Sequence, residues 1–60
     1  MKLLIDIAMD NAAFEDCPNL EAARILEDYA KELKWGLTIT EVNLKDLNGA
    51  RVGKAVIELE

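Results

Sequence analysis

The stretch Asp46-Leu47-Asn48-Gly49 decides the fold, because it places a chain reversal between two strand-like segments. Asp at the first turn position, Asn at the third and Gly at the fourth favour a type I turn followed by a glycine bulge. Residues 37–59 are therefore predicted to form a β-hairpin. The register of this turn gives the cross-strand pairs Leu44–Val52, Ile39–Ile57 and Leu37–Leu59.

The register also assigns the two faces of the hairpin, since side chains alternate between faces along a strand. The face expected in the core carries Leu37, Ile39, Ala55, Ile57 and Leu59. A two-residue turn at Asn48 and Gly49 is the alternative, and it would shift the pairing by one residue. We prefer the first register because the shift breaks the match between apolar residues.

Residues 2–9 alternate in the same way and predict a first strand. One face is wholly apolar and is expected in the core: Leu3, Ile5, Ile7 and Met9. The other face is mixed: Lys2, Leu4, Asp6 and Ala8.

Residues 19–35 have the spacing of an amphipathic helix. Its apolar stripe is Ala22, Ile25, Leu26, Tyr29, Ala30 and Leu33, and its charged side is Glu21, Arg24, Glu27, Asp28, Lys31, Glu32 and Lys34. Pro18 is tolerated in a first turn, and either Asp16 or Asn19 is a possible N-cap. Gly36 suits the left-handed residue that ends a helix.

The predicted element order is β-α-β-β, which is an α+β fold in one small domain spanning residues 1–60. A single helix can cover one face of a three-stranded sheet and leaves the other face bare. We favour the strand order 1-3-2, as in half of a ferredoxin-like fold. The order 3-2-1, in which the first two strands are parallel, is the alternative.

The bare face is expected to be apolar enough to form an interface. Its apolar residues include Leu4, Val42, Leu44, Val52 and Val56. Scattered exposed aliphatic side chains are also normal on protein surfaces, so the composition alone leaves both interpretations open. A chain of 60 residues with one Cys and no His has neither a disulfide nor a zinc site to stabilise it. We therefore predict a homodimer formed through this face.

The composition indicates a protein that is not an enzyme and uses no cofactor. The commonest general base, His, is absent, and Cys17 lies beside Glu15 and Asp16, whose charges disfavour a thiolate. The three glycines are too far apart for a phosphate-binding loop. No metal is expected, although Asp6, Asp10, Glu15 and Asp16 could in principle gather around a hard cation.

The chain is acidic, with 12 Asp and Glu against 7 Lys and Arg and a net charge of −5. Such a charge disfavours direct contact with nucleic acid or an anionic membrane and favours a basic protein surface. The longest apolar run, residues 3–5, is too short to cross a membrane, and residues 1–9 do not resemble a signal peptide. A single Cys fits a reducing cytoplasm.

The junction between the first strand and the helix, residues 10–16, has two interpretations. In the structural one, Asn11 caps a single helical turn, Phe14 plugs the open end of the core, and Asp16 caps the main helix. In the functional one, the junction binds a basic partner, with Asp10, Glu15 and Asp16 as an acidic rim beside Asn11 and Phe14. The two interpretations are compatible.

Three blocks of the sequence resemble a family of very short proteins encoded by phages and prophages: residues 10–16, residues 23–26, and residues 44–49 followed by Val52-Gly53. The resemblance spans nearly the whole chain. It implies a protein made in the cytoplasm of an infected bacterium, and small acidic phage proteins often inhibit a host protein. We therefore expect an inhibitor of a host bacterial protein, most concretely an anti-defence protein such as an anti-CRISPR. The alternative is a small regulatory or assembly module with a phage-encoded partner.

Overall fold

The chain folds into a three-stranded sheet and one long helix, as seen in a computed structural model that describes residues 1–36 and 40–59. The elements are β1 (Lys2–Ile7), the 3-10 turn η1 (Ala12–Phe14), α1 (Pro18–Lys34), β2 (Glu41–Lys45) and β3 (Arg51–Glu58). The predicted α+β fold and its β-α-β-β order are confirmed, with the short turn η1 added in the junction.

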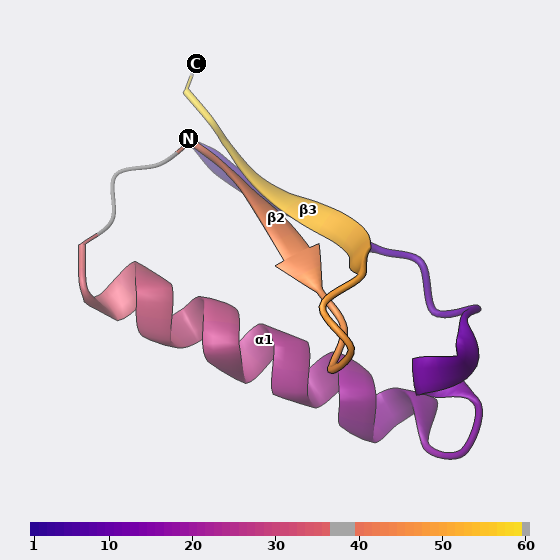
Figure 1. The fold of residues 1–60 in the computed structure, drawn as a ribbon. Helices are drawn as coiled ribbons and strands as arrows, with labels where there is room; N and C mark the ends of the chain where they lie inside the picture. The colour runs from indigo at the N-terminus through magenta and orange to yellow at the C-terminus, as the bar shows by residue number, and fades with distance from the viewer. Residues whose placement is uncertain (37–39, 60) are drawn as a thin grey trace.

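The sheet is antiparallel, and its strand order is β1-β3-β2. The predicted order 1-3-2 is therefore confirmed and the alternative order 3-2-1 is wrong. β1 pairs with β3 along its whole length, from Lys2 opposite Glu58 to Ile7 opposite Gly53. Figure 1 shows α1 on one side of the sheet, with the two chain termini at the same end of the molecule.

The turn that joins β2 to β3 has the predicted geometry. The backbone N–H of Gly49 donates to the carbonyl of Asp46 at 3.0 Å, and Gly49 has a φ of 86°, which disfavours any residue with a side chain. The backbone N–H groups of Asn48 and Ala50 both donate to the Asp46 carboxylate at 2.9 Å. These bonds fix the type I turn and its glycine bulge from within the loop.

Beyond the turn, the predicted register is wrong by one residue. Lys45 lies opposite Arg51 as expected, but Leu44 lies opposite Gly53, so Val52 is an extra residue in β3. The predicted pairs of Leu37 and Ile39 lie outside the described residues. Next to the bulge, a Cβ on Gly53 would collide with the carbonyl of Asp6, so β1 and β3 approach more closely there than other residues allow.

This shift moves three residues away from the face on which we expected them. Leu44 is 4% exposed and belongs to the core, and Val42 and Val52 pack against the core from the same side. The expectation that these three residues line the bare face of the sheet is therefore wrong. A register shift of one residue exchanges the two faces of a strand, which explains the error. Of the predicted interface residues, only Leu4 and Val56 lie away from the core cluster.

The helix α1 begins and ends largely as the sequence predicts. Pro18 occupies the first turn and Cys17 is the N-cap residue, without a hydrogen bond from its side chain, so the predicted capping by Asp16 or Asn19 is wrong. At the other end, Gly36 has a φ of 74° and its N–H donates to the carbonyl of Leu33 at 3.1 Å. The glycine therefore ends the helix in the left-handed conformation that the sequence predicts.

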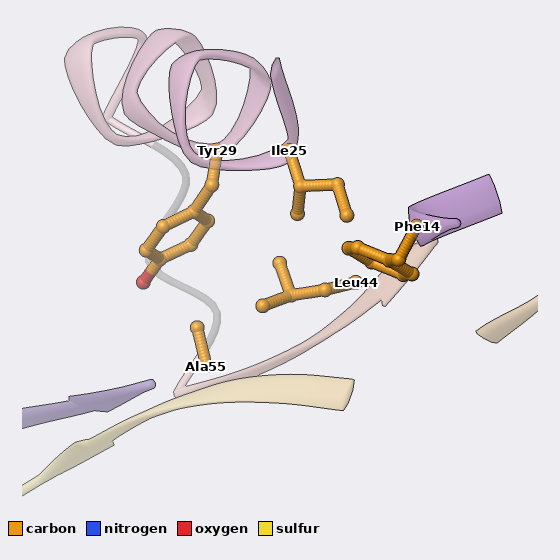
Figure 2. Packing of buried hydrophobic residues seen from close by; sticks show 5 residues of the cluster. All are labelled: Phe14, Ile25, Tyr29, Leu44 and Ala55. Atoms are coloured by element: carbon orange, nitrogen blue, oxygen red, sulfur yellow. The ribbon is translucent and has the colours of Figure 1, made fainter. Parts of the chain in front are cut away.

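The hydrophobic core lies where η1, α1 and the hairpin meet, and Figure 2 shows its five buried side chains. They are Phe14, Ile25, Tyr29, Leu44 and Ala55. Phe14 projects from η1 and is 3% exposed, which confirms that it plugs one end of the core. Ile25 and Tyr29 confirm the middle of the predicted helical stripe.

Of the rest of the predicted core, Ile7, Ala22 and Ile57 are half-buried, whereas Leu59 is exposed and much of the remainder is open. Leu3 and Ile5 of β1 and Leu26 and Leu33 of α1 are each between 39% and 45% exposed, and Met9 and Ala30 are exposed as well. The reason is the placement of the helix, which packs mainly against η1 and β2 and leaves the inner side of β1 uncovered. Figure 1 shows α1 diverging from the strands towards its C-terminal end. We call Leu3, Ile5, Leu26 and Leu33 the open apolar face.

Candidate functional site

Two buried carboxylates tie the helix to the hairpin turn. Glu21 and Asp46 are each only 6% exposed. Arg24 donates to both carboxylate oxygens of Glu21, at 2.9 and 3.0 Å, and Glu21 also accepts from the backbone N–H of Leu47 at 2.9 Å. Arg24 further donates to Asp28 at 3.0 Å and to the carbonyl of Lys45 at 3.3 Å. One arginine therefore bridges the first turns of α1 and the end of β2.

Asp46 extends this network to the junction. Besides the two turn N–H groups, its carboxylate accepts a hydrogen bond from the Asn11 amide at 2.8 Å. The other end of the Asn11 side chain accepts from the backbone N–H of Ala13 at 2.9 Å and so caps η1. Within the part of the chain that the structure describes, every buried side-chain polar atom has a partner.

The network holds both carboxylates in their charged form. The hydrogen bond from Arg24 lowers the pKa of Glu21 below its ordinary value, with a smaller contribution from the Leu47 N–H, and these outweigh the effect of burial. Burial raises the pKa of Asp46, but the hydrogen bonds from Ala50, Asn11 and Asn48 together outweigh it, so this pKa is also lowered. Hydrogen bonds donated to a carboxylate favour its ionised state.

The predicted partner-binding residues divide into two groups. Phe14 is in the core and Asn11 is half-buried and bonded within the network, so the structural interpretation is confirmed for both. The side chains of Asp10, Glu15 and Asp16 are exposed and make no hydrogen bond or ion pair with the residues that the structure describes. We call these three carboxylates the acidic rim.

The acidic rim does not form a metal centre with its neighbours. Among residues 1–36 and 40–59, no group of three or more Asp, Glu, Cys or His side chains is placed to hold an ion. The four carboxylates considered for a cation, Asp6 together with the rim, are therefore not gathered around one point. Cys17, next to the rim, is exposed and has a free thiol. The acidic rim therefore presents three negative charges to solvent from a backbone that Asn11 and Phe14 hold in place.

The bare face of the sheet is more polar than the sequence suggests. Leu4 and Val56 share a depression with Ile5 and with charged side chains, which are Asp6, Glu41, Lys54 and Glu58. Lys54 forms an ion pair with Glu41 at 3.5 Å across β2 and β3. Because Val42, Leu44 and Val52 lie on the core side, only Leu4 and Val56 of the predicted interface remain on the bare face. Four charged side chains surround them.

Sequence reasoning missed the buried network, because it placed Glu21 on the solvent side of the helix. A signal was present in the spacing: Glu21, Ile25 and Tyr29 follow one another at intervals of four, and all three are buried. Residues four apart on a helix lie on the same face. A carboxylate in line with two core residues therefore indicates a buried acid that needs a partner, which Arg24 provides one turn later.

Comparison with protein-family models, with curated proteins and with solved structures gives no match to this chain. The geometry does relate the three blocks described above. Asn11 and Phe14 of the first block, Arg24 and Ile25 of the second, and Asp46 of the third meet in the core and its polar network. No helix among the described residues combines the length and the hydrophobicity that crossing a membrane requires.

Proposed function

We propose that this chain is a non-enzymatic phage or prophage accessory protein that binds and inhibits a host bacterial protein in the host cytoplasm. An anti-defence inhibitor, such as an anti-CRISPR, is the most concrete form of the proposal. The observation that carries the binding of a basic partner is the acidic rim: three exposed carboxylates, Asp10, Glu15 and Asp16, without partners among the described residues. The phage context comes from the sequence resemblance described above.

The backbone that carries the acidic rim is held in place by contacts of neighbouring residues. Asn11 is bonded to Asp46 and caps η1, and Phe14 is anchored in the core directly before Glu15. A rim of this kind loses little conformational freedom when a partner binds, which lowers the cost of association. Preorganised surface charges also raise the rate at which a complementary surface is found.

The distribution of charge supports a basic partner surface. Residues 3–30 contain seven carboxylates and a single cation, Arg24, whose guanidinium is already bonded to Glu21 and Asp28. The remaining Lys residues and Arg51 lie outside this segment. Negative charge therefore predominates over the junction and the first half of α1, whereas Lys31 and Lys34 lie in its last turns and Arg51 and Lys54 line the same depression as Asp10.

A regulatory or assembly module with a phage-encoded partner is the second candidate. The same rim would serve it, because its recognition chemistry does not depend on the origin of the basic surface. The two candidates differ in where the partner is found: in an uninfected host for the first, and only during phage expression for the second.

The test is an affinity pull-down of the tagged protein from host lysate, read by mass spectrometry. The test variant carries Glu15→Lys and Asp16→Lys. The matched control carries Glu27→Lys and Glu32→Lys, which changes the net charge equally at two exposed helix positions without hydrogen-bond partners among the described residues. We expect one host protein to be enriched by the wild type and the control but lost by the rim variant.

Enrichment should also weaken with salt, because interactions between exposed charges are screened beyond about 10 Å at 0.1 M ionic strength. Equal loss of the partner in both variants would mean that net charge alone is responsible, and would contradict a role for the rim. Enrichment only from lysate of infected cells would favour the second candidate.

A further inference from the structure

The open apolar face combines two surfaces that each lack a cover. Leu3 and Ile5 lie on the inner side of β1, opposite Ile57 and Ala55 of β3, and thus on the same side of the sheet as the core. A sheet face of this composition normally packs against a helix or a second sheet. Among the described residues, α1 packs against β2 and η1, and neither surface of the open apolar face is buried.

The orientation of α1 places Leu26 and Leu33 on the flank nearer to β1. The opposite flank is fixed by Arg24, which donates to the carbonyl of Lys45 at the end of β2. Leu26 and Leu33 follow Arg24 by two and nine residues, which places them about 180–200° from it around the helix axis. Since β2 is an edge strand and β1 is the opposite edge, this flank points across β3 towards β1.

The exposed area supports the same conclusion. The chain exposes 4548 Å², whereas a monomer of 6.7 kDa is expected to expose about 3,900 Å². The excess of about 600 Å² belongs to the whole surface, and the four partly exposed residues of the open apolar face contribute to it.

We propose that a second copy of this chain covers the open apolar face, with the helix flank of each copy packed on the inner side of β1 of the other. The chain itself carries both halves of the missing contact: an apolar strand face without a helix, and an apolar helix flank without a sheet. A two-fold axis lets each copy supply to its partner what the partner supplies in return. This proposal keeps the predicted homodimer but places its contact on the side of the sheet that carries the helix, in place of the bare face.

The charges of the molecule are compatible with this contact. The open apolar face extends from the middle and C-terminal half of α1 to Leu3 and Ile5 of β1. The acidic rim lies at the other end of the molecule, beside η1 (Figure 1). The proposed dimer can therefore form without bringing two acidic rims together, and it leaves both rims free. The two proposals can fail separately.

The first test compares two neighbouring residues of β1. Leu3 and Leu4 are equally exposed, at 45% each, but lie on opposite faces of the sheet. By sedimentation equilibrium, we expect the wild type and Leu4→Lys to be dimers at about 100 μM, and Leu3→Lys to be a monomer with unchanged helical circular dichroism. A monomeric wild type, or a dimer that Leu4→Lys splits and Leu3→Lys does not, overturns the proposal.

A second test asks whether β1 of one copy meets α1 of the other. Ile5→Lys and Leu26→Glu are each expected to form monomers, because each buries an unpaired charge in both contacts of the dimer. An equimolar mixture should form a heterodimer, since one contact then holds a Lys–Glu pair and the other holds the two native side chains. A mixture that stays monomeric, or single variants that remain dimers, contradicts the proposed contact. This test does not depend on the behaviour of Leu3→Lys.

Discussion

The two ends of this small domain differ in how completely their side chains are buried and hydrogen-bonded. At the junction end, Phe14 and Leu44 are buried and the carboxylates of Glu21 and Asp46 have all their hydrogen bonds. At the open end, Leu3 and the other residues of the open apolar face are about half exposed. This difference indicates that the polar network and Phe14 position the helix. The apolar stripe of the helix alone is not sufficient to make it cover the whole sheet.

The largest expected effect is loss of the plug at the junction end. Phe14→Ala should lower the free energy of unfolding by about 3–5 kcal/mol, since it leaves a cavity in the core. For a domain of this size, such a loss abolishes most of the folded population. Urea denaturation followed by circular dichroism measures it. A cost below about 1 kcal/mol would show that the junction end is not the better-packed end.

A second prediction compares the stability cost of replacing two glycines, Gly53 and Gly49, by alanine. Gly53→Ala forces a Cβ against the Asp6 carbonyl, and we expect a loss of about 1–3 kcal/mol or more from overpacking between β1 and β3. A Cβ at Gly49 would meet open space, so the free energy of unfolding should fall only by the cost of a side chain at a φ of 86°, about 1–2 kcal/mol. The same denaturation experiment ranks the two. If Gly49→Ala costs more, β1 and β3 separate at Gly53 at little cost, which contradicts a tight contact there.

The polar network predicts how stability depends on pH. The pKa values of Glu21 and Asp46 are lowered in the folded chain. Their stabilisation is therefore complete above the unfolded values of about 4 and is lost as the pH falls through the lower folded values. The urea midpoint should fall steeply between pH 5 and pH 2, and Asp46→Asn should flatten this fall.

Glu15→Gln is the matched control for that experiment, because this rim carboxylate has no partner among the described residues. We expect the control to follow the wild-type pH profile. An Asp46→Asn profile with the wild-type slope would contradict a stabilising role for this carboxylate.

The smallest effect is expected at the open end of a single chain. Leu33 is 39% exposed, so Leu33→Ala should change the free energy of unfolding by less than about 1 kcal/mol when the protein is dilute enough to be monomeric. Repeating the denaturation at high protein concentration sharpens the comparison. The cost should then grow, because Leu33 is buried in the proposed dimer. A cost that is large even in dilute solution would show that α1 already covers this end.

Features with a local cause could be predicted from the sequence. Asp46 and Gly49 supply all the hydrogen bonds and the positive φ that their turn requires, and Gly36 ends the helix by the same conformational freedom. The order of elements follows from these turns and from the periodicity between them. The strand order 1-3-2 is one of two orders compatible with this connection, and the structure decides between them.

Features that depend on contacts between distant segments could not be predicted. The bulge at Val52 decides that Leu44 faces the core, and the neighbouring Gly53 is in contact with the Asp6 carbonyl of another strand. The burial of Glu21 depends on the Leu47 N–H, 26 residues away. In the candidate site, the sequence predicts both a structural and a partner-binding role for Phe14 and Asn11, and the structure confirms the structural one. The exposure of Asp10, Glu15 and Asp16 required the structure.

The most direct test of the contrast between the two ends is a methyl NMR spectrum recorded at about 10 μM and at about 1 mM, across the range where a weak dimer assembles. We predict that the methyl signals of Leu3, Ile5, Leu26 and Leu33 move with concentration while those of Ile25 and Leu44 stay in place. Spectra that do not change with concentration, or changes confined to Leu4 and Val56 on the bare face, would contradict the account.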